Sequence, residues 1–189
     1  MMMRSIGALI SAWRHYRRSS RGAAAAEFAI MLPLLTIPVL NAIDLGVYAY
    51  DRMELNLAAQ VAAQQAWVLC AVNGKVPATV TVNGKANCPG FGAAETSAAQ
   101  SMTLGSSVTI TSTTENYYCL NSSNQLVVVG PVTSPEPADC TSANPKSTDA
   151  PGDYVLVTAS YSYSPLFAQV SVASKLTTPI TQTAWMRLN

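Results

Sequence analysis

Charged residues, histidine and metal-binding spacings are all scarce in this chain. Only 11% of its 189 residues are charged, and the single histidine is His15. No Cys-x-x-Cys spacing is present, which makes a structural zinc site a poor interpretation of the cysteines. No glycine-rich phosphate loop follows an expected strand, and the acidic residues are scattered rather than paired in a motif. We therefore expect a protein that is not an enzyme and has no cofactor.

Basic residues are few over most of the chain. Five of the eleven Lys and Arg residues lie within residues 1–22, where there is no acid, and six lie beyond them against ten acids. The chain after residue 22 is therefore net acidic. It offers no basic surface for nucleic acid, so we expect no nucleic-acid partner.

Apolar residues, in contrast, make up 49% of the chain and are concentrated in residues 22–43, where Glu27 is the sole charge. As a helix this run would extend about 33 Å, close to the roughly 30 Å of a bilayer's hydrocarbon core. A basic flank stays on the cytoplasmic side of a membrane. The pattern predicts a single-pass inner-membrane protein with a cytoplasmic N-terminus and a periplasmic chain from about Asp44 onward.

Three interpretations compete for this segment. A secretory signal peptide would place small residues after its apolar core, whereas here "GAAAA" comes before it. A plain membrane anchor fits the length but leaves Glu27 unexplained, because a carboxylate is costly in hydrocarbon. The third interpretation is a leader that is cleaved after Gly22, which would make Ala23 the new N-terminus, with Glu27 and Phe28 as its fifth and sixth residues.

The third interpretation matches a known family. The stretch "RRSSRGAAAAEFAIMLPLL", followed by "AIDLGVYAYDRMELNLAAQVAAQQAW", resembles the opening of TadE-like minor pseudopilins of the tight-adherence (Tad, or Flp) pilus system. The closing segments "GDYVLVTASYSYSPLF" and "ITQTAWMRLN" are similar to that family's last strands. Residues 71–150 carry no motif of the family.

The resemblance implies a processing step and a set of partners. A prepilin peptidase would remove the leader by cutting between Gly22 and Ala23, and Glu27 would then pair with the freed amine of a neighbouring subunit. The implied partners are the major pilin, a sister pseudopilin and the Tad assembly platform, and the implied role is pilus assembly and surface adhesion. A second role for Glu27, compatible with the first, is to cap the first helical turn. The position in the pilus, tip, shaft or base, stays open.

The sequence predicts an α+β fold with three parts. Residues 1–22 form the leader, residues 23–70 a membrane-spanning and amphipathic stem helix, and residues 71–189 an extracytoplasmic head with a mostly antiparallel sheet. Strands are expected at 76–82, 106–120, 125–129, 153–163 and 179–188, and the proline-rich residues 130–152 are expected to form a surface loop. The expected buried face of the stem is formed by Leu45, Tyr48, Leu55, Ala59, Ala62, Ala66 and Leu69.

The four cysteines lie on the oxidising side of the membrane by this orientation, so disulfides are expected. Three pairings are possible. We favour Cys70 with Cys88 and Cys119 with Cys140, which would close a loop at the helix end and hold the proline-rich loop.

One other function remains open from the sequence. The chain would be an uncleaved, membrane-anchored extracytoplasmic domain for binding or adhesion. Tyrosines at 117, 118, 161 and 163 could supply a stacking surface, although alternating strand tyrosines more often pack in the core or at a sheet edge.

Overall fold

The structure, a computed structural model, describes residues 20–176 and 178–189. Residues 1–19 of the expected leader therefore lie outside the described residues. The chain divides into two compact units. The first contains the chain up to Gly46 together with Pro165–Lys175, and the second contains Val47–Ser164 and Leu176–Asn189.

The long helix α2 (Ser20–Gln65) contributes residues to both units. It continues as a π-helical turn, η1 (Ala66–Ala71). Pro33 and Pro38 lie inside the helix, where each lacks the N–H that would bond to the preceding turn. Near them, the Thr36 hydroxyl donates to the Leu32 carbonyl oxygen at 2.7 Å, which supplies one side-chain bond within this part of the helix.

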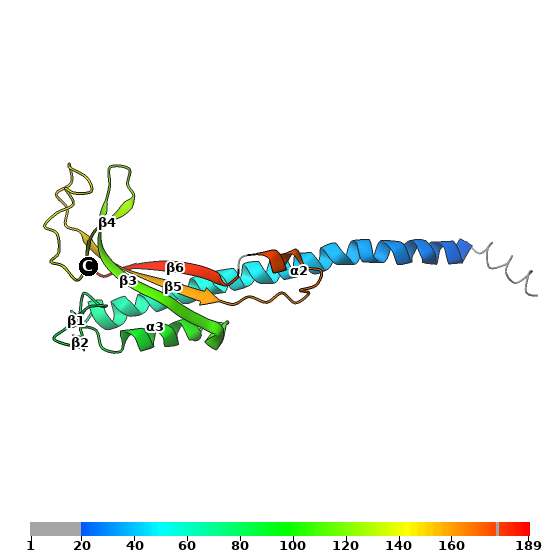
Figure 1. Cartoon of the computed structure of the whole chain (residues 1–189), viewed down its shortest axis with the longest axis horizontal. Helices are drawn as coiled ribbons and strands as arrows, with labels where there is room; N and C mark the ends of the chain where they lie inside the picture. Colours follow the sequence, from blue (N-terminus) through cyan, green and yellow to red (C-terminus); the bar gives the residue numbers. More distant parts are fainter. Residues whose placement is uncertain (1–19, 177) are drawn as a thin grey trace, which may run out of the picture. The chain divides into compact units, whose positions relative to one another are not determined.

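The second unit contains a four-stranded antiparallel sheet in the order β4-β3-β5-β6 (Figure 1). Its strands are β3 (Val108–Leu120), β4 (Leu126–Pro131), β5 (Gly152–Tyr161) and β6 (Ile180–Arg187). The long helix followed by antiparallel strands confirms the expected α+β fold. Four of the five expected strands are present near their expected positions.

The two edge strands of this sheet, β4 and β6, differ in how regularly they pair with their neighbours. Strand β4 is short and ends at Pro131, and the register of its pairing with β3 shifts between Tyr117 and Tyr118. Strand β6 pairs with β5 without a shift. Alongside β6, α2 contributes Asn56, whose amide lies 3.5 Å from the Gln182 side-chain oxygen. A groove in this region is lined by Asn56, Gln60, Gln64, Thr183, Ala184, Trp185 and Met186.

The core of the second unit joins small helix residues to branched strand residues. Fully buried positions on the helix include Leu55, Ala59, Ala62 and Ala66, and those on β5 include Val155, Val157 and Ala159. Alanine at the helix surface lets a sheet approach closely, because no side chain extends beyond Cβ.

The expected buried face of the stem is confirmed only from Leu55 to Ala66. Leu45 is exposed, and Leu69 is half-buried within the π-helical turn, which changes the helical spacing. Along β5, the alternating residues Val155, Val157 and Ala159 are buried, and the alternation ends there. Ser160 is buried, Tyr161 is half-buried, and Tyr163 lies beyond the end of β5.

The segment between η1 and β3 differs most from expectation. The expected strand over 76–82 reduces to β1 (Thr81–Val82), which pairs with β2 (Lys85–Ala86) across Asn83 and Gly84. Both turn residues have positive φ, at 51° and 74°, as a tight hairpin of this kind requires. The strand prediction for 76–82 was therefore wrong outside its last two residues.

A helix that the sequence analysis did not predict follows, α3 (Phe91–Gln100). Phe91, Glu95 and Ala99 are its buried residues and recur every four positions, which places them on one face. This helix lies against β3 and η1 within the second unit (Figure 1).

Candidate functional site

The start of α2 carries the residues of the expected processing site. Gly22 is exposed, and a Cβ added there would meet no atom within 4 Å. Ala23 is the next residue in the same helical turn. Glu27 is exposed, and the Phe28 side chain is 65% exposed. The helix therefore brings the four residues together in two turns and leaves Gly22, Glu27 and Phe28 accessible.

The helix after Glu27 exposes apolar side chains. Within Ala24–Ala71 lies a stretch that is long and apolar enough to cross a membrane, as judged by length and composition. Its exposed large side chains are Phe28, Ile30, Met31, Leu32, Leu34, Leu35, Ile37, Val39 and Ile43. A helix that is apolar on all sides needs an apolar surrounding, either lipid or other helices.

At the end of this stretch, two polar side chains of α2 bind the segment Pro165–Lys175, which we call the clasp. The Asp44 carboxylate accepts the backbone N–H of Leu166 at 2.9 Å and of Phe167 at 3.2 Å. The Asn41 side-chain oxygen accepts the Val172 N–H at 2.6 Å. Asp44 is fully buried by these contacts.

The Asn41 amide group also donates twice. Its Nδ2 lies 2.8 Å from the Ile37 carbonyl oxygen and 3.1 Å from that of Val170. Both ends of the Asn41 side chain are thus paired. The clasp finishes in a short 3₁₀ helix, η3 (Val172–Lys175), and buries Ser171 and Ala173.

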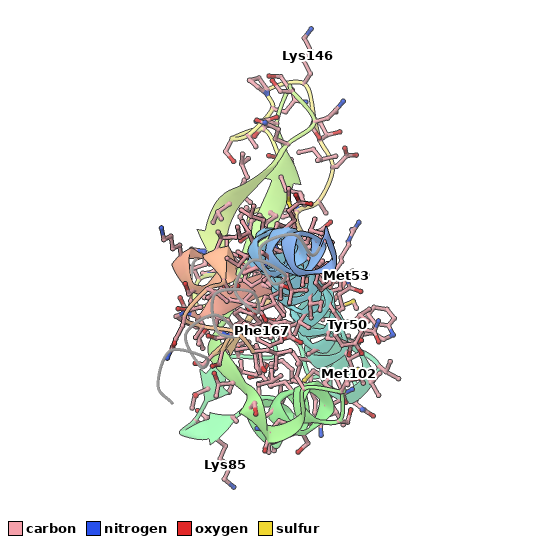
Figure 2. All side chains as sticks on the ribbon, turned by 90° about the vertical axis from the view of Figure 1, so that its right-hand side faces the viewer. Tyr50, Met53, Lys85, Met102, Lys146 and Phe167 are labelled. Carbon is pink, nitrogen blue, oxygen red and sulfur yellow. A yellow bond between two sulfur atoms is a disulfide. The ribbon has the colours of Figure 1, made fainter. Side chains whose placement is uncertain are left out.

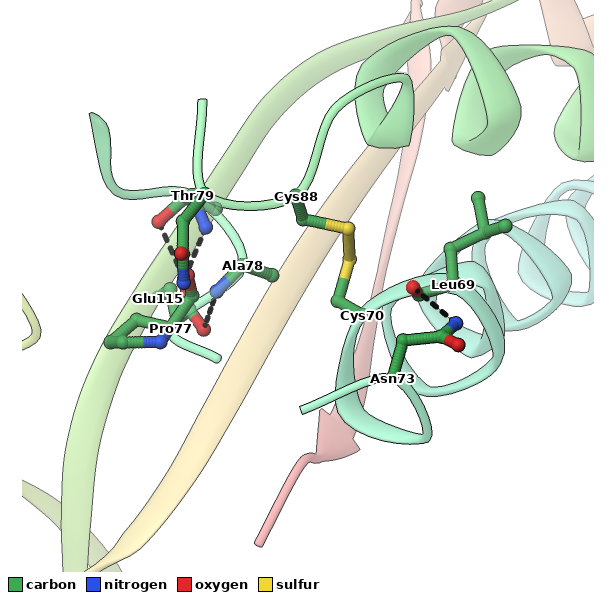
Figure 3. Close-up of a disulfide and its surroundings, with 9 residues drawn as sticks. Leu69, Cys70, Asn73, Pro77, Ala78, Thr79, Cys88 and Glu115 are labelled. Carbon is green, nitrogen blue, oxygen red and sulfur yellow. Dashed lines mark hydrogen bonds between the residues drawn. A yellow bond between two sulfur atoms is a disulfide. The ribbon is translucent and has the colours of Figure 1, made fainter. Parts of the chain in front are cut away.

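In the second unit the four cysteines form two disulfides, Cys70–Cys88 and Cys119–Cys140. This is the pairing favoured from the sequence. The first joins η1 to the loop before α3 (Figure 3). The second joins β3 to the proline-rich loop.

The buried carboxylate of Glu115 holds the segment that follows η1. Both oxygens of Glu115 on β3 accept backbone N–H groups, from Ala78 at 2.7 Å and from Thr79 at 2.6 Å (Figure 3). The Thr79 hydroxyl adds a third bond at 2.6 Å. Glu115 therefore anchors residues 78–79 to the sheet.

A second carboxyl group, that of Asp153 on β5, lies beside Glu115. Burial and the neighbouring Glu115 raise the pKa of Asp153 from 3.8 to about 7. Its Oδ1 atom is buried and has no hydrogen-bond partner within the described residues. On α3, Glu95 accepts the Thr113 hydroxyl at 2.9 Å, and burial raises its pKa as well.

The tyrosines are used mainly for packing. Tyr117, Tyr118 and Tyr163 are buried. Tyr118 makes edge contacts with Tyr154 and Trp185, and Tyr163 makes one with Tyr48. Among the described residues, no group of three or more His, Cys, Asp or Glu side chains is placed to hold a metal ion.

The comparison with protein families concerns the helix described first. Residues 22–64 match the family model described as TadE-like protein. The match confirms the resemblance stated from the sequence, and it begins at Gly22 and includes Glu27, Asn41 and Asp44. It covers less than half of the chain and indicates a protein associated with the Tad pilus. No curated protein and no solved structure matches the chain.

Sequence reasoning did not identify Asn41 and Asp44 as functional candidates. The available signal was their position, since they are polar residues at the end of a long apolar run. Their partners are more than 120 residues away in the chain, and nothing in the local pattern of "NAID" points to them.

Proposed function

We propose that this chain is a minor pseudopilin of a Tad pilus, which a prepilin peptidase cleaves between Gly22 and Ala23. After cleavage it acts in pilus assembly and surface adhesion together with the major pilin, a sister pseudopilin and the assembly platform in the inner membrane. The observation that carries the proposal is the family match, which starts at the proposed cleavage site and continues along α2.

The exposure of α2 supports assembly through the helix. Apolar side chains are exposed along the proposed span, and exposed side chains continue beyond it at Tyr50, Met53 and Leu57. Figure 2 shows Tyr50 and Met53 on the same side of the second unit. Such a face suits packing against the helices of other subunits once the protein leaves the bilayer.

Glu27 gives the assembly a register. Two opposite charges attract much more strongly at the edge of a low-dielectric medium than in water, and each is costly there if left alone. The freed Ala23 amine of one subunit and the Glu27 carboxylate of the next are opposite charges of this kind. Each would be costly without the other. Their pairing draws an incoming subunit to one fixed axial position.

The cleavage is tested by the intact mass and N-terminal sequence of protein extracted from membranes of cells with and without the peptidase. We expect a start at Ala23 only where the peptidase is present. Gly22→Val should abolish this cut without disturbing the helix, because the site has room for a side chain. Gly46→Val is the matched control, since Gly46 is a helical glycine with equally open surroundings, and it should be cut normally.

The role of Glu27 is tested separately. Glu27→Gln should be cleaved as the unchanged protein is but should fail to enter pili, as measured by its amount in sheared pilus fractions. Glu54→Gln, a second glutamate of α2, should enter them normally. A chain that keeps its residues before Gly22 in cells with the peptidase would instead support the uncleaved, membrane-anchored binding domain.

A further inference from the structure

The clasp lies where the apolar run of α2 ends. As a helix, residues 22–43 extend about 33 Å, slightly more than a hydrocarbon core of roughly 30 Å. The clasp is bonded to Asn41 and Asp44, at the last turn of that run and just beyond it. Its backbone is therefore level with the boundary between lipid chains and headgroups.

The hydrogen bonding at this level is suited to a medium with little water. An unpaired amide or carboxylate costs several kcal/mol when it is removed from water. The clasp supplies three backbone N–H groups and one carbonyl oxygen to Asn41 and Asp44. In return, Asn41 and Asp44 supply hydrogen-bond partners to backbone groups of the clasp. The clasp needs them because it belongs to no sheet and is not part of α2. Irregular backbone near lipid requires such pairing.

The clasp exposes large apolar side chains, alongside the polar Gln169 and Ser174. Leu166 is 65% exposed, Val170 is 45% exposed and Val172 is 52% exposed. The clasp contains no acid, and its one charged residue, Lys175, is exposed at its end. Exposed apolar groups beside a cationic side chain are typical of segments that lie in the membrane interface, where lysine extends its charge to the headgroups.

We propose that the clasp is a lipid-contact element, in which Leu166, Val170 and Val172 enter the boundary between headgroups and acyl chains of the phospholipid leaflet. Asn41 and Asp44 hold it at that depth. The helix thereby gains a stop that prevents it from sliding through the bilayer. The inference rests on the membrane span of the proposed function but requires neither cleavage nor pilus assembly.

The test uses the full chain in vesicles of phosphatidylcholine and phosphatidylglycerol, with a photoreactive phenylalanine analogue placed at one position at a time. The positions are Leu166 and Val170 in the clasp, Leu34 in the span and Val128 on β4, which is similarly exposed. After irradiation, mass spectrometry identifies the adducts. We expect phospholipid adducts at Leu34, Leu166 and Val170, and severalfold fewer at Val128.

Each other outcome has a definite meaning. Lipid adducts at Leu34 but only background levels at Leu166 and Val170 overturn the inference and leave the span intact. Adducts at the clasp with a second copy of the chain in place of lipid also overturn it. The lack of adducts at Leu34 would remove the span and with it the inference.

A second variant tests the positioning residues. Asn41→Leu combined with Asp44→Leu removes the clasp's main hydrogen-bond partners and keeps the helix apolar. We expect lipid adducts at Leu166 to fall severalfold while those at Leu34 stay unchanged. Mobility on a non-reducing gel checks that both disulfides have formed, which separates release of the clasp from misfolding. Unchanged lipid capture at Leu166 would show that Asn41 and Asp44 do not set its depth.

Discussion

The carboxyl group of Asp153 on β5 lies beside that of Glu115 on the adjacent strand β3, and burial together with this neighbour raises the pKa of Asp153. Two carboxylates that lie close together in a buried site repel each other, so the protonated form of one of them is favoured. Glu115 accepts three hydrogen bonds from Ala78 and Thr79, whereas the Oδ1 atom of Asp153 has no partner within the described residues. Asp153 is therefore the group that holds the proton, in agreement with the direction of its raised pKa.

This pair makes the folded chain more stable in mild acid. The pKa of Asp153 is raised from 3.8 to about 7 on folding. The contribution of Asp153 to the free energy of unfolding is therefore full below about pH 4, and it declines as the pH rises to about 7. We expect the free energy of unfolding at pH 8 to be lower than at pH 5 by on the order of 2 kcal/mol from this group. Thermal unfolding of the full chain in detergent, followed by circular dichroism, measures the difference.

Two substitutions separate the sources of this pH dependence. In Asp153→Asn the side chain keeps its size and does not titrate, so the decline between pH 5 and pH 8 should shrink. Glu95→Gln should remove a smaller part of the decline, because burial raises the pKa of Glu95 too. An Asp153→Asn protein with the full decline would contradict the assignment.

The Glu115 carboxylate should be the most sensitive polar site in the second unit. Glu115→Ala leaves the buried N–H of Ala78 without its acceptor and also exposes Asp153 to an empty space. We expect a loss of about 3 kcal/mol or more, measured by denaturant unfolding. Glu136→Ala is the control, since that glutamate is exposed in the proline-rich loop, and it should change stability by less than about 0.5 kcal/mol.

The Cys119–Cys140 disulfide should protect the proline-rich loop. The two cysteines are 21 residues apart, and closing a loop of that size stabilises a protein by roughly 3 kcal/mol. In the Cys119→Ala, Cys140→Ala double variant, trypsin should cut after Lys146 faster. Lys146 is exposed in this loop, and Figure 2 shows it extending outward. Cleavage after Lys85, on the β1–β2 hairpin, should keep its rate and serves as the internal control.

The alanine face of α2 leaves no room for larger side chains. Ala62 is fully buried, so Ala62→Leu should destabilise the second unit by about 1–3 kcal/mol through overpacking. Gln64→Leu, two residues away and exposed, should change the unfolding free energy by less than about 0.5 kcal/mol. An Ala62→Leu protein as stable as the control would show that this face can separate from the sheet.

The long helix and the last strands could be predicted because their signals are local and repeated. Residues 22–43 are apolar except at Glu27, Thr36 and Asn41, and β3 and β5 are rich in β-branched residues. The cysteine pairing was favoured because it would close a loop at the helix end and hold the proline-rich loop, and the structure contains this pairing.

Other elements depend on contacts that the local sequence does not encode. The stretch at 76–82 has the β-branched residues of a strand, but Glu115 draws Ala78 and Thr79 into a turn. Helix α3 is short, begins at Gly90 with a φ of 83° and buries a glutamate, so its apolar period is weak. The clasp needs Asn41 and Asp44, which are separated from it in the chain by β3, β4 and β5.

The edge strands of the sheet, β4 and β6, limit the ways in which copies of this protein can associate. An exposed strand edge is a template for pairing with further chains. Strand β4 is short, its pairing is interrupted by a bulge, and it finishes in a proline, while amide side chains of α2 lie along β6. Pairing of a strand from another chain with β4 or with β6 is therefore disfavoured. Under the proposed function, copies of this chain that meet at high local concentration would be directed away from amyloid-like stacking and toward contact through the helix.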